Sequence, residues 1–254
     1  WFTATRAVSG LRSSVIHSAS AVRRPVLCGA QVTVGSGSSW SLGDSVIEWG
    51  CADLNVDGTL NVEAALTASA DSVAINAGGT VAGGSGTLGL TGDFINHGTF
   101  SKGTGTVAVR DGCGNTVSAL SGGQNFHSLS VTTTSGKTLV MASGSTTSVG
   151  PGLLTLQGSA GNLLKIRASV PGNQALTSLN GSQSIRYVDV ADNWGMAQVL
   201  APGPASASNS MTSGNVLNWF DVLPIIPTLS ALGLVLLAFG MVAVSRLNRP
   251  ARSL

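Results

Sequence analysis

The chain has 254 residues, of which 34 are glycine, 43% are hydrophobic, 9% are charged and 5% are aromatic. Charged residues usually make up about 25% of a soluble protein, so this composition argues against a helical bundle and favours short strands joined by frequent turns. The formal net charge of +2 hides an acidic middle, because residues 31–221 hold all 11 acidic residues but only six of the 13 basic ones. That balance argues against nucleic acid as a partner.

Residues 1–27 contain four arginines, no acidic residue and no apolar stretch of the kind found in signal peptides. We predict a poorly ordered N-terminal segment. The C-terminal segment described below predicts export, and an exported protein needs a signal peptide, so we interpret the sequence as a fragment whose start lies upstream of Trp1.

Three cysteines follow, Cys28, Cys51 and Cys113. In an exported protein they meet an oxidising compartment, so we predict one disulfide, with all three pairings open. None of them stands in a Cys-x-x-Cys pair and the 3 histidines are isolated in the sequence. We therefore predict no metal site and no cofactor.

Residues 28–201 are predicted to form the folded body. A Gly-Thr-apolar unit recurs there, starting at Gly58, Gly79, Gly86, Gly98 and Gly105. Short segments of alternating apolar and polar residues separate these units. Equivalent units are separated by about 20 residues. This repeat predicts an all-β parallel β-helix, also called a β-solenoid, in which each coil covers the apolar face of the coil before it. The alternative is a β-sandwich with similar strand spacing.

Two segments of this body, 37–60 and 92–113, resemble repeat segments of adhesin-like, β-helical surface proteins of bacteria. The resemblance lies in units such as 96–100, Asn-His-Gly-Thr-Phe, and 103–107, Gly-Thr-Gly-Thr-Val. It implies a repetitive surface-protein architecture.

Two short motifs resemble binding sites only in part. Asp53, Asn55 and Asp57 match the first half of a calcium loop, but Ala64 stands where that loop needs a bidentate glutamate. The same residues alternate with leucine and valine, which predicts a strand. At 136–138, Gly-Lys-Thr is similar to the end of a phosphate loop, but Val131 replaces its leading glycine, so we predict a turn.

Strongly apolar strands are predicted over 137–142, 153–158, 163–169 and 184–192. The last of them carries Arg186, Asp189 and Asp192, residue types that some parallel β-helices use to cleave polysaccharides. Strand alternation makes Arg186 and Asp189 point to opposite faces, however. A carbohydrate-active enzyme therefore stays as an alternative, and we assign no catalytic residue.

Residues 202–223 are predicted to be a closing segment and linker, in which Asn218, Trp219 and Phe220 cover the open end of the stack. Beyond them, 225–245 is free of charge and about 20 residues long, which is enough for a helix to cross a bilayer. Arg246, Arg249 and Arg252 follow and would stay on the cytoplasmic side. We predict one C-terminal transmembrane helix, with the inner membrane as its partner.

Segment 224–254 also resembles the IPTL-CTERM sorting signals of Gram-negative surface proteins. The matching residues are Ile226, Pro227, Thr228, Leu229 and Gly233, followed by the apolar stretch and the arginines. The resemblance implies processing by an exosortase-like peptidase, transient anchoring in the inner membrane and delivery to the cell surface.

Together these features predict an exported cell-surface structural or adhesive β-solenoid, with polysaccharide or extracellular matrix as a partner. Two alternatives remain open: a polysaccharide lyase or glycosidase on a β-helix, and the stalk-and-anchor fragment of a larger surface protein.

Overall fold

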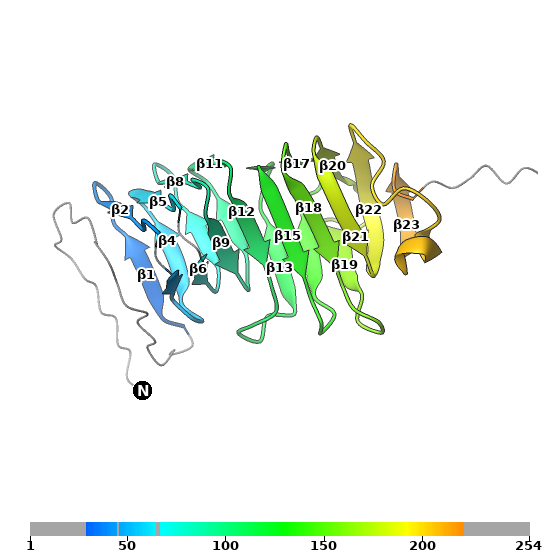
Figure 1. Cartoon of the computed structure of the whole chain (residues 1–254), viewed down its shortest axis with the longest axis horizontal. Helices are drawn as coiled ribbons and strands as arrows, with labels where there is room; N and C mark the ends of the chain where they lie inside the picture. The colour runs from blue at the N-terminus through cyan, green and yellow to red at the C-terminus, as the bar shows by residue number, and fades with distance from the viewer. Residues whose placement is uncertain (1–28, 45, 65–66, 221–254) are drawn as a thin grey trace, which may run out of the picture. The chain divides into compact units, whose positions relative to one another are not determined.

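The computed structural model describes residues 29–44, 46–64 and 67–220. These residues form an elongated stack of short strands (Figure 1). The chain divides into two compact units, Trp1–Asp221 and Val222–Leu254, and the second unit lies outside the described residues.

Three strands make one coil, and about 8 coils follow one another along the chain. Strands at the same position of successive coils lie on one side of the solenoid, and we name the three sides face A, face B and face C. Face A contains β1 (Gln31–Val34), β4 (Asp53–Val56), β7 (Val73–Ile75), β10 (Phe94–Asn96), β13 (Val117–Leu120), β16 (Thr138–Met141) and β19 (Leu164–Ala168). Face B contains β2 (Ser39–Ser41), β5 (Thr59–Asn61), β8 (Thr80–Ala82), β11 (Thr99–Ser101), β14 (Asn125–Phe126), β17 (Thr146–Val149) and β20 (Ala175–Leu179). Face C contains β3 (Val46–Glu48), β6 (Thr67–Ala70), β9 (Thr87–Leu90), β12 (Thr106–Val109), β15 (Ser128–Thr132), β18 (Leu153–Gln157) and β21 (Ser182–Arg186).

The last coil has one long strand, β22 (Val188–Met196), which serves two faces. Its first residues pair with β19 on face A, whereas its last residues pair with β20 on face B. A 3₁₀ helix, η1 (Ala205–Ser208), and a final strand, β23 (Met211–Leu217), follow.

The strand register confirms the predicted repeat in the first coils. Thr59 pairs with Thr80, and Thr80 pairs with Thr99, on face B. On face C, Thr87 pairs with Thr106 in the same way. The Gly-Thr-apolar unit thus occupies equivalent places in successive coils, with threonine on the outer surface and the next residue pointing inward.

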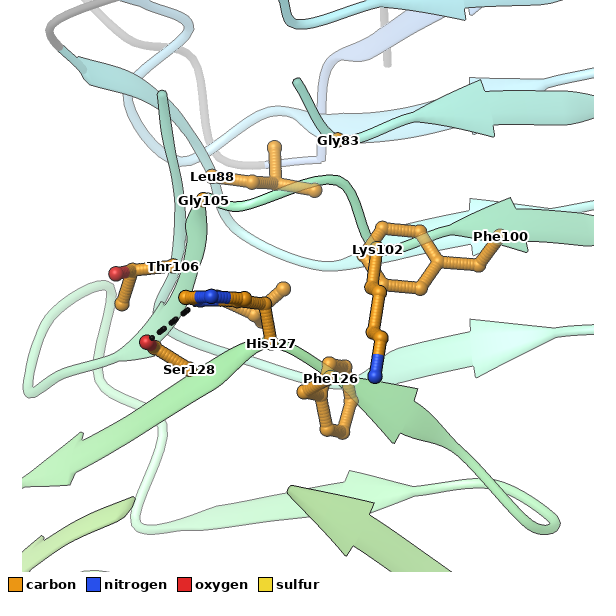
Figure 2. A pocket seen from close by; sticks show the side chains of 10 residues that line it. Gly83, Leu88, Phe100, Lys102, Gly105, Thr106, Phe126, His127 and Ser128 are labelled. Atoms are coloured by element: carbon orange, nitrogen blue, oxygen red, sulfur yellow. Dashed lines mark hydrogen bonds between the residues drawn. The ribbon is translucent and has the colours of Figure 1, made fainter. Parts of the chain in front are cut away.

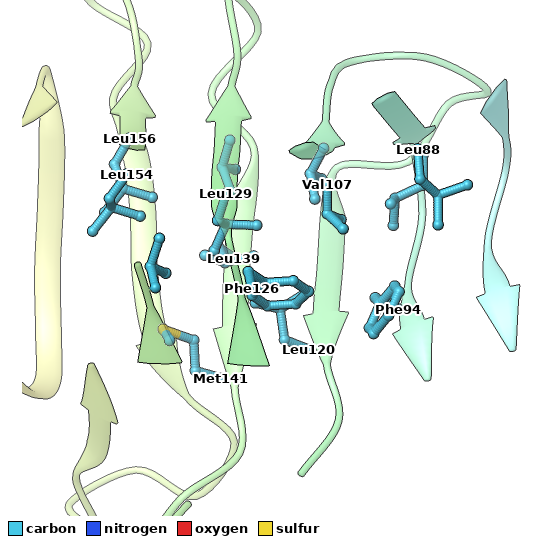
Figure 3. Close-up of a cluster of buried hydrophobic side chains, with 14 of the residues drawn as sticks. Leu88, Phe94, Val107, Leu120, Phe126, Leu129, Leu139, Met141, Leu154 and Leu156 are labelled. Atoms are coloured by element: carbon cyan, nitrogen blue, oxygen red, sulfur yellow. The ribbon is translucent and has the colours of Figure 1, made fainter. Parts of the chain in front are cut away.

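The core is a continuous column of inward side chains from all three faces. Leu, Val and Ile fill most of it, and the burial of each such side chain stabilises the fold by about 1.5–3 kcal/mol. Midway along the column, Phe94, Phe100 and Phe126 contact one another, with ring centroids 5.3 to 5.8 Å apart. Figure 3 shows Phe94 and Phe126 between the leucines of neighbouring coils.

The predicted solenoid is confirmed, and two parts of the fold prediction are corrected. The β-sandwich alternative is wrong, because the strands pair in parallel whereas sandwich sheets are antiparallel. The predicted combination of a solenoid with a transmembrane helix is also corrected. Residues 225–245 lie outside the described residues, and the described part of the chain contains no helix long and apolar enough to cross a membrane.

The predicted closing segment continues the stack as far as Phe220. Strand β23 pairs in parallel with β22 and so adds a further layer. Trp219 and Phe220 are buried, with 4% and 5% of their surface exposed, and Trp219 Nε1 donates a hydrogen bond to Asn193 Oδ1 at 2.8 Å. These two aromatic residues therefore pack against the end of the core.

Candidate functional site

The Gly-Thr units create rows of hydroxyl side chains on the outer surface. On face B the row consists of Ser39, Thr59, Thr80 and Thr99, which pair in that order. On face C a shorter row consists of Thr87, Thr106 and Ser128. Parallel strands lie about 4.8 Å apart, so each row presents its side chains at that interval along the solenoid axis.

The glycine of each unit lets the chain turn the corner close to the neighbouring coil. A Cβ atom on Gly79 would lie 2.0 Å from the carbonyl oxygen of Val56, and one on Gly98 would lie 2.3 Å from that of Gly79. Neither position can accept a side chain without a shift of backbone. The glycines therefore fix the register that aligns the threonines.

The three residues considered for polysaccharide cleavage do not come together. Arg186 lies on face C beside Gln157, whereas Asp189 lies on face A. Asp189 is only 7% exposed and forms an ion pair with Arg167 of the preceding coil. Arg167 also donates to the Asp189 carbonyl oxygen at 2.7 Å, and Ser213 donates to Asp189 Oδ1 at 2.6 Å. The carboxylate is thus held by contacts between coils.

Asp192 lies beside an open groove of about 440 Å³ between neighbouring turns of the last coils, lined by Ser143, Gly144, Gly172, Asn173, Gln174 and Asn215. Asn215 donates to Asp192 Oδ1 at 2.6 Å and to the Gly172 carbonyl oxygen at 3.1 Å. The hydrogen bond from Asn215 lowers the pKa of Asp192. Gln174 donates to the Asn215 carbonyl oxygen at 3.0 Å. The polar groups of this groove therefore hold successive turns together.

A buried lysine holds the corner between faces C and A. Lys137 is 1% exposed, and its Nζ donates to the carbonyl oxygens of Thr91 and Asn115, both at 2.7 Å, and to Ser118 Oγ at 3.2 Å. Burial lowers the pKa of Lys137, while the nearby carboxylates of Asp111, Asp71 and Asp93 oppose that shift. The amine binds carbonyl groups of two earlier coils and so acts as an internal clamp.

The turn that leads to Lys137 uses its amide groups internally. Thr133 Oγ1 accepts hydrogen bonds from the backbone N–H groups of Ser135, Gly136 and Lys137. Asp111 Oδ2 accepts from the N–H groups of Thr134 and Ser135 at 2.7 and 3.2 Å. These backbone N–H groups already donate hydrogen bonds within the protein, whereas a phosphate loop would point them at a ligand. The arrangement is thus that of a structural turn and not of a phosphate loop.

A disulfide joins Cys51 to Cys113, one of the three pairings that the sequence leaves open. Their Cα atoms lie 5.5 Å apart although the residues are 62 positions apart in the chain. Cys51 precedes β4 of the second coil and Cys113 precedes β13 of the fifth, so the bridge spans the coils between them. Cys28 lies outside the described residues.

The partial calcium motif forms strand β4, as predicted. Leu54 and Val56 point into the core, whereas Asp53 and Asn55 alternate with them on the outer side. Asp57 Oδ1 accepts a hydrogen bond from Asn76 Nδ2 at 2.7 Å in the next coil. Within the described ranges, no three His, Cys, Asp or Glu side chains gather as a metal site would require.

A small hollow lies beside Phe100, Lys102, Phe126 and His127 (Figure 2). Its volume is about 10 Å³, which is room for roughly one water molecule. Lys102 Nζ donates to Asn125 Oδ1 at 3.1 Å and to the Gly150 carbonyl oxygen at 2.7 Å. His127 Nδ1 lies 3.2 Å from Ser128 Oγ. The hollow is part of the packing between coils.

The residues predicted to form the sorting signal lie outside the described residues, namely Ile226, Pro227, Thr228, Leu229, Gly233, Arg246, Arg249 and Arg252. Sequence reasoning missed Arg167 and Lys137 as residues that hold the coils together. Their only signal was a long cation in or directly before an otherwise apolar strand, and Lys165 in the same strand as Arg167 gives the same signal.

Comparison of the chain with protein-family models, with curated proteins and with solved structures finds no match.

Proposed function

We propose that this chain is an extracellular structural or adhesive protein of the bacterial cell surface. Its fold is a parallel β-solenoid, which is consistent with a structural or adhesive repeat protein. The observation that supports adhesion best is the surface itself. Faces B and C of the first coils present aligned hydroxyl side chains over successive strands, and these strands carry one charged residue, Glu48.

The disulfide supports export. Disulfides form and persist in oxidising compartments, whereas the cytosol keeps thiols reduced. Cys51 and Cys113 are 62 positions apart in the chain, so it is the folding of the solenoid that brings them within bonding distance. The pairing thus fits a protein that folds outside the cytoplasm.

For delivery to the surface, we propose that the IPTL-type segment beginning at Ile226 is a sorting signal processed by an exosortase-like peptidase. The support is the sequence resemblance alone. Peptide mapping of the C-terminus of protein isolated from the surface of native cells tests it. We expect the arginine-rich tail to be missing, and its presence on the surface form would contradict processing.

Adhesion is tested by retention of the full chain on a panel of neutral and anionic bacterial and plant polysaccharides. We expect retention on at least one of them. A protein that is retained on none would contradict the adhesive function and leave a purely structural role.

A further inference from the structure

Three places in the chain have an aspartate or asparagine directly before a glycine, at 57–58, 111–112 and 180–181. At such a place the backbone nitrogen of the glycine can attack the carbonyl carbon of the preceding side chain and close a five-membered ring. Glycine hinders this attack least, because it has no Cβ and its backbone adopts conformations that other residues avoid. Which of the three pairs can react depends on how the fold holds them.

The fold holds the two pairs that contain aspartate. Asp57 Oδ1 accepts a hydrogen bond from Asn76 Nδ2 at 2.7 Å, and the Gly58 N–H group donates to the Val34 carbonyl oxygen at 2.9 Å. Asp111 Oδ2 accepts from two backbone N–H groups of the turn after β15. An ionised carboxylate is also a poor electrophile, so we expect neither pair to react.

The pair at 180–181 is not held in this way. Asn180 directly follows β20, at the corner between faces B and C, and it is exposed. Within the described ranges, its side-chain amide has no hydrogen-bond partner and the Gly181 N–H group has no acceptor. The attacked carbon and the attacking nitrogen are therefore both unengaged.

We propose that Asn180 is a deamidation site of the folded protein, with Gly181 as its intramolecular nucleophile. The Gly181 nitrogen forms a bond to Asn180 Cγ, the bond from Cγ to the amide nitrogen breaks, and ammonia leaves with the proton that the backbone nitrogen gives up through water. The product is a succinimide. Water opens this ring at either carbonyl and leaves aspartate, or isoaspartate in which the main chain runs through the side chain. The net reaction consumes one water molecule and releases one ammonia, and it does not depend on the adhesive role.

Gln198 restrains the backbone on both sides of this site. Its Nε2 donates to the carbonyl oxygens of Leu179 and Gly181, at 3.1 and 2.9 Å. Ring closure requires the backbone to rotate between Asn180 and Gly181, so these two hydrogen bonds slow the reaction. The folded chain should therefore deamidate at Asn180 more slowly than the unfolded chain, and faster without Gln198.

Deamidation changes both the charge and the fit of this corner. The flanking strands β20 and β21 carry one charged residue, Arg186, so the new carboxylate adds a negative charge to a nearly neutral region. Isoaspartate also lengthens the backbone by one methylene. Gly181 has no room for it, since even an added Cβ would lie 2.0 Å from the Gly152 carbonyl oxygen. We expect the isoaspartate form to loosen β21, which hydrogen exchange would detect.

The test incubates the full chain in mildly alkaline buffer, because base promotes loss of the backbone proton, and maps its peptides by mass spectrometry at successive times. We expect the amide-to-acid mass gain to appear first at Asn180, as both aspartate and isoaspartate. The variant Asn180→Gln should lose this signal, since its longer side chain closes a ring far more slowly. Asn173 is the internal control: it is exposed and its side chain has no partner among the described residues, but glutamine follows it. It should keep its amide over the same period.

A second pair of variants tests the restraint. Gln198→Ala should deamidate several-fold faster than the parent chain. The control Gln174→Ala removes a hydrogen bond to the Asn215 carbonyl oxygen at another corner and should leave the rate unchanged. Equal rates in all three proteins would contradict the role of Gln198.

Two results would overturn the deamidation site itself. In one, the folded chain keeps its Asn180 amide over a period in which the chain unfolded in urea loses it, in the parent and in Gln198→Ala alike. In the other, Asn173 reacts as fast as Asn180, so that exposure alone and not the following glycine sets the rate.

Discussion

The first four coils and the last three build the same stack by different means. In coils one to four the strands have three or four residues, whereas β18 to β21 have five and β22 has nine. The coils also differ in the length of chain they use. Leu54 pairs with Val73 near the start of the stack, whereas Thr138 pairs with Lys165 further on, so the later coil takes up a longer stretch of sequence.

The difference shows how coil length decides what holds a solenoid together. Close backbone contacts at glycine corners occur in both regions, at Gly79 in the first coils and at Gly181 in the last, so what distinguishes the short first coils is the Cys51–Cys113 bridge. A long coil buries more, and the last coils add the Arg167–Asp189 ion pair and a closing aromatic pair. The two regions should therefore respond to different substitutions.

The largest effect on stability is expected at the C-terminal end of the stack, where Trp219 and Phe220 pack against the core. Trp219→Ala removes a buried indole and its hydrogen bond to Asn193, and should lower the free energy of unfolding by about 4 kcal/mol. Leu217→Ala is the control, because Leu217 is 48% exposed on the neighbouring strand. Hydrogen exchange should show faster opening of β22 and β23 than of the first coils. Uniform loss of protection across all coils would contradict a division of the stack into two regions.

In the first coils the corresponding weak point is the disulfide. Cys51→Ser with Cys113→Ser frees a loop of 62 residues in the unfolded chain and should cost about 2–4 kcal/mol, the usual range for a disulfide, measured by urea unfolding. A reducing agent should destabilise the parent chain by a similar amount and leave the double variant unchanged. An equal response of both proteins to reductant would show that the bridge does not stabilise these coils.

A smaller effect is expected at the glycine corners. Gly79→Ala places a Cβ against the Val56 carbonyl oxygen and should cost about 2 kcal/mol through backbone displacement. Gly35→Ala is the matched control, since its added Cβ would meet only Ser38 Oγ at 3.9 Å. If the two variants have equal melting temperatures, close packing of the corners is not what sets the register.

The smallest effect concerns acid sensitivity at Asp111. Burial raises the pKa of Asp111, but hydrogen bonds from Thr133, Thr134 and Ser135 outweigh it and leave the pKa below its ordinary value of 3.8. The unfolded chain therefore binds this proton first, and the stabilisation is lost as the pH falls from about 3.8 through the lower pKa of the folded state. Asp111→Asn should flatten the dependence of stability on pH in that range. An unchanged slope would mean that the carboxylate is not held by these groups.

The sequence predicts most of the first coils because one short motif carries their geometry. The spacing of Gly58, Gly79 and Gly98 matches the observed register of the threonines that follow them. In the later coils the strands predicted over 137–142, 153–158 and 163–169 are found as β16, β18 and β19. Their register is harder to predict, since the loops vary in length and no motif marks equivalent positions. Strand β23 was missed because it contains Gly214 and Asn215 among small polar residues, and only its pairing with β22 makes it a strand.

The contacts between coils were the least predictable part of the candidate site. The predicted single strand over 184–192 is instead two strands, β21 and β22, which meet at a corner where Tyr187 has a positive φ of 53°. This corner, and not strand alternation, separates Arg186 from Asp189, and the sequence gives no partner for either residue. Arg167 reaches Asp189 from the preceding coil, and that contact depends on how the two strands align. Such partners follow from register, which the sequence of the later coils leaves open.

The most direct test of the proposed adhesive role measures retention and glycan chain length in the same experiment. The full chain is incubated with each polysaccharide of the panel, the bound fraction is determined, and the length distribution of the polymer is compared before and after. We expect the protein to be retained and the polymer to keep its length. Shortening of the polymer that disappears in Asp189→Asn would contradict this account and show that the acidic strand is catalytic.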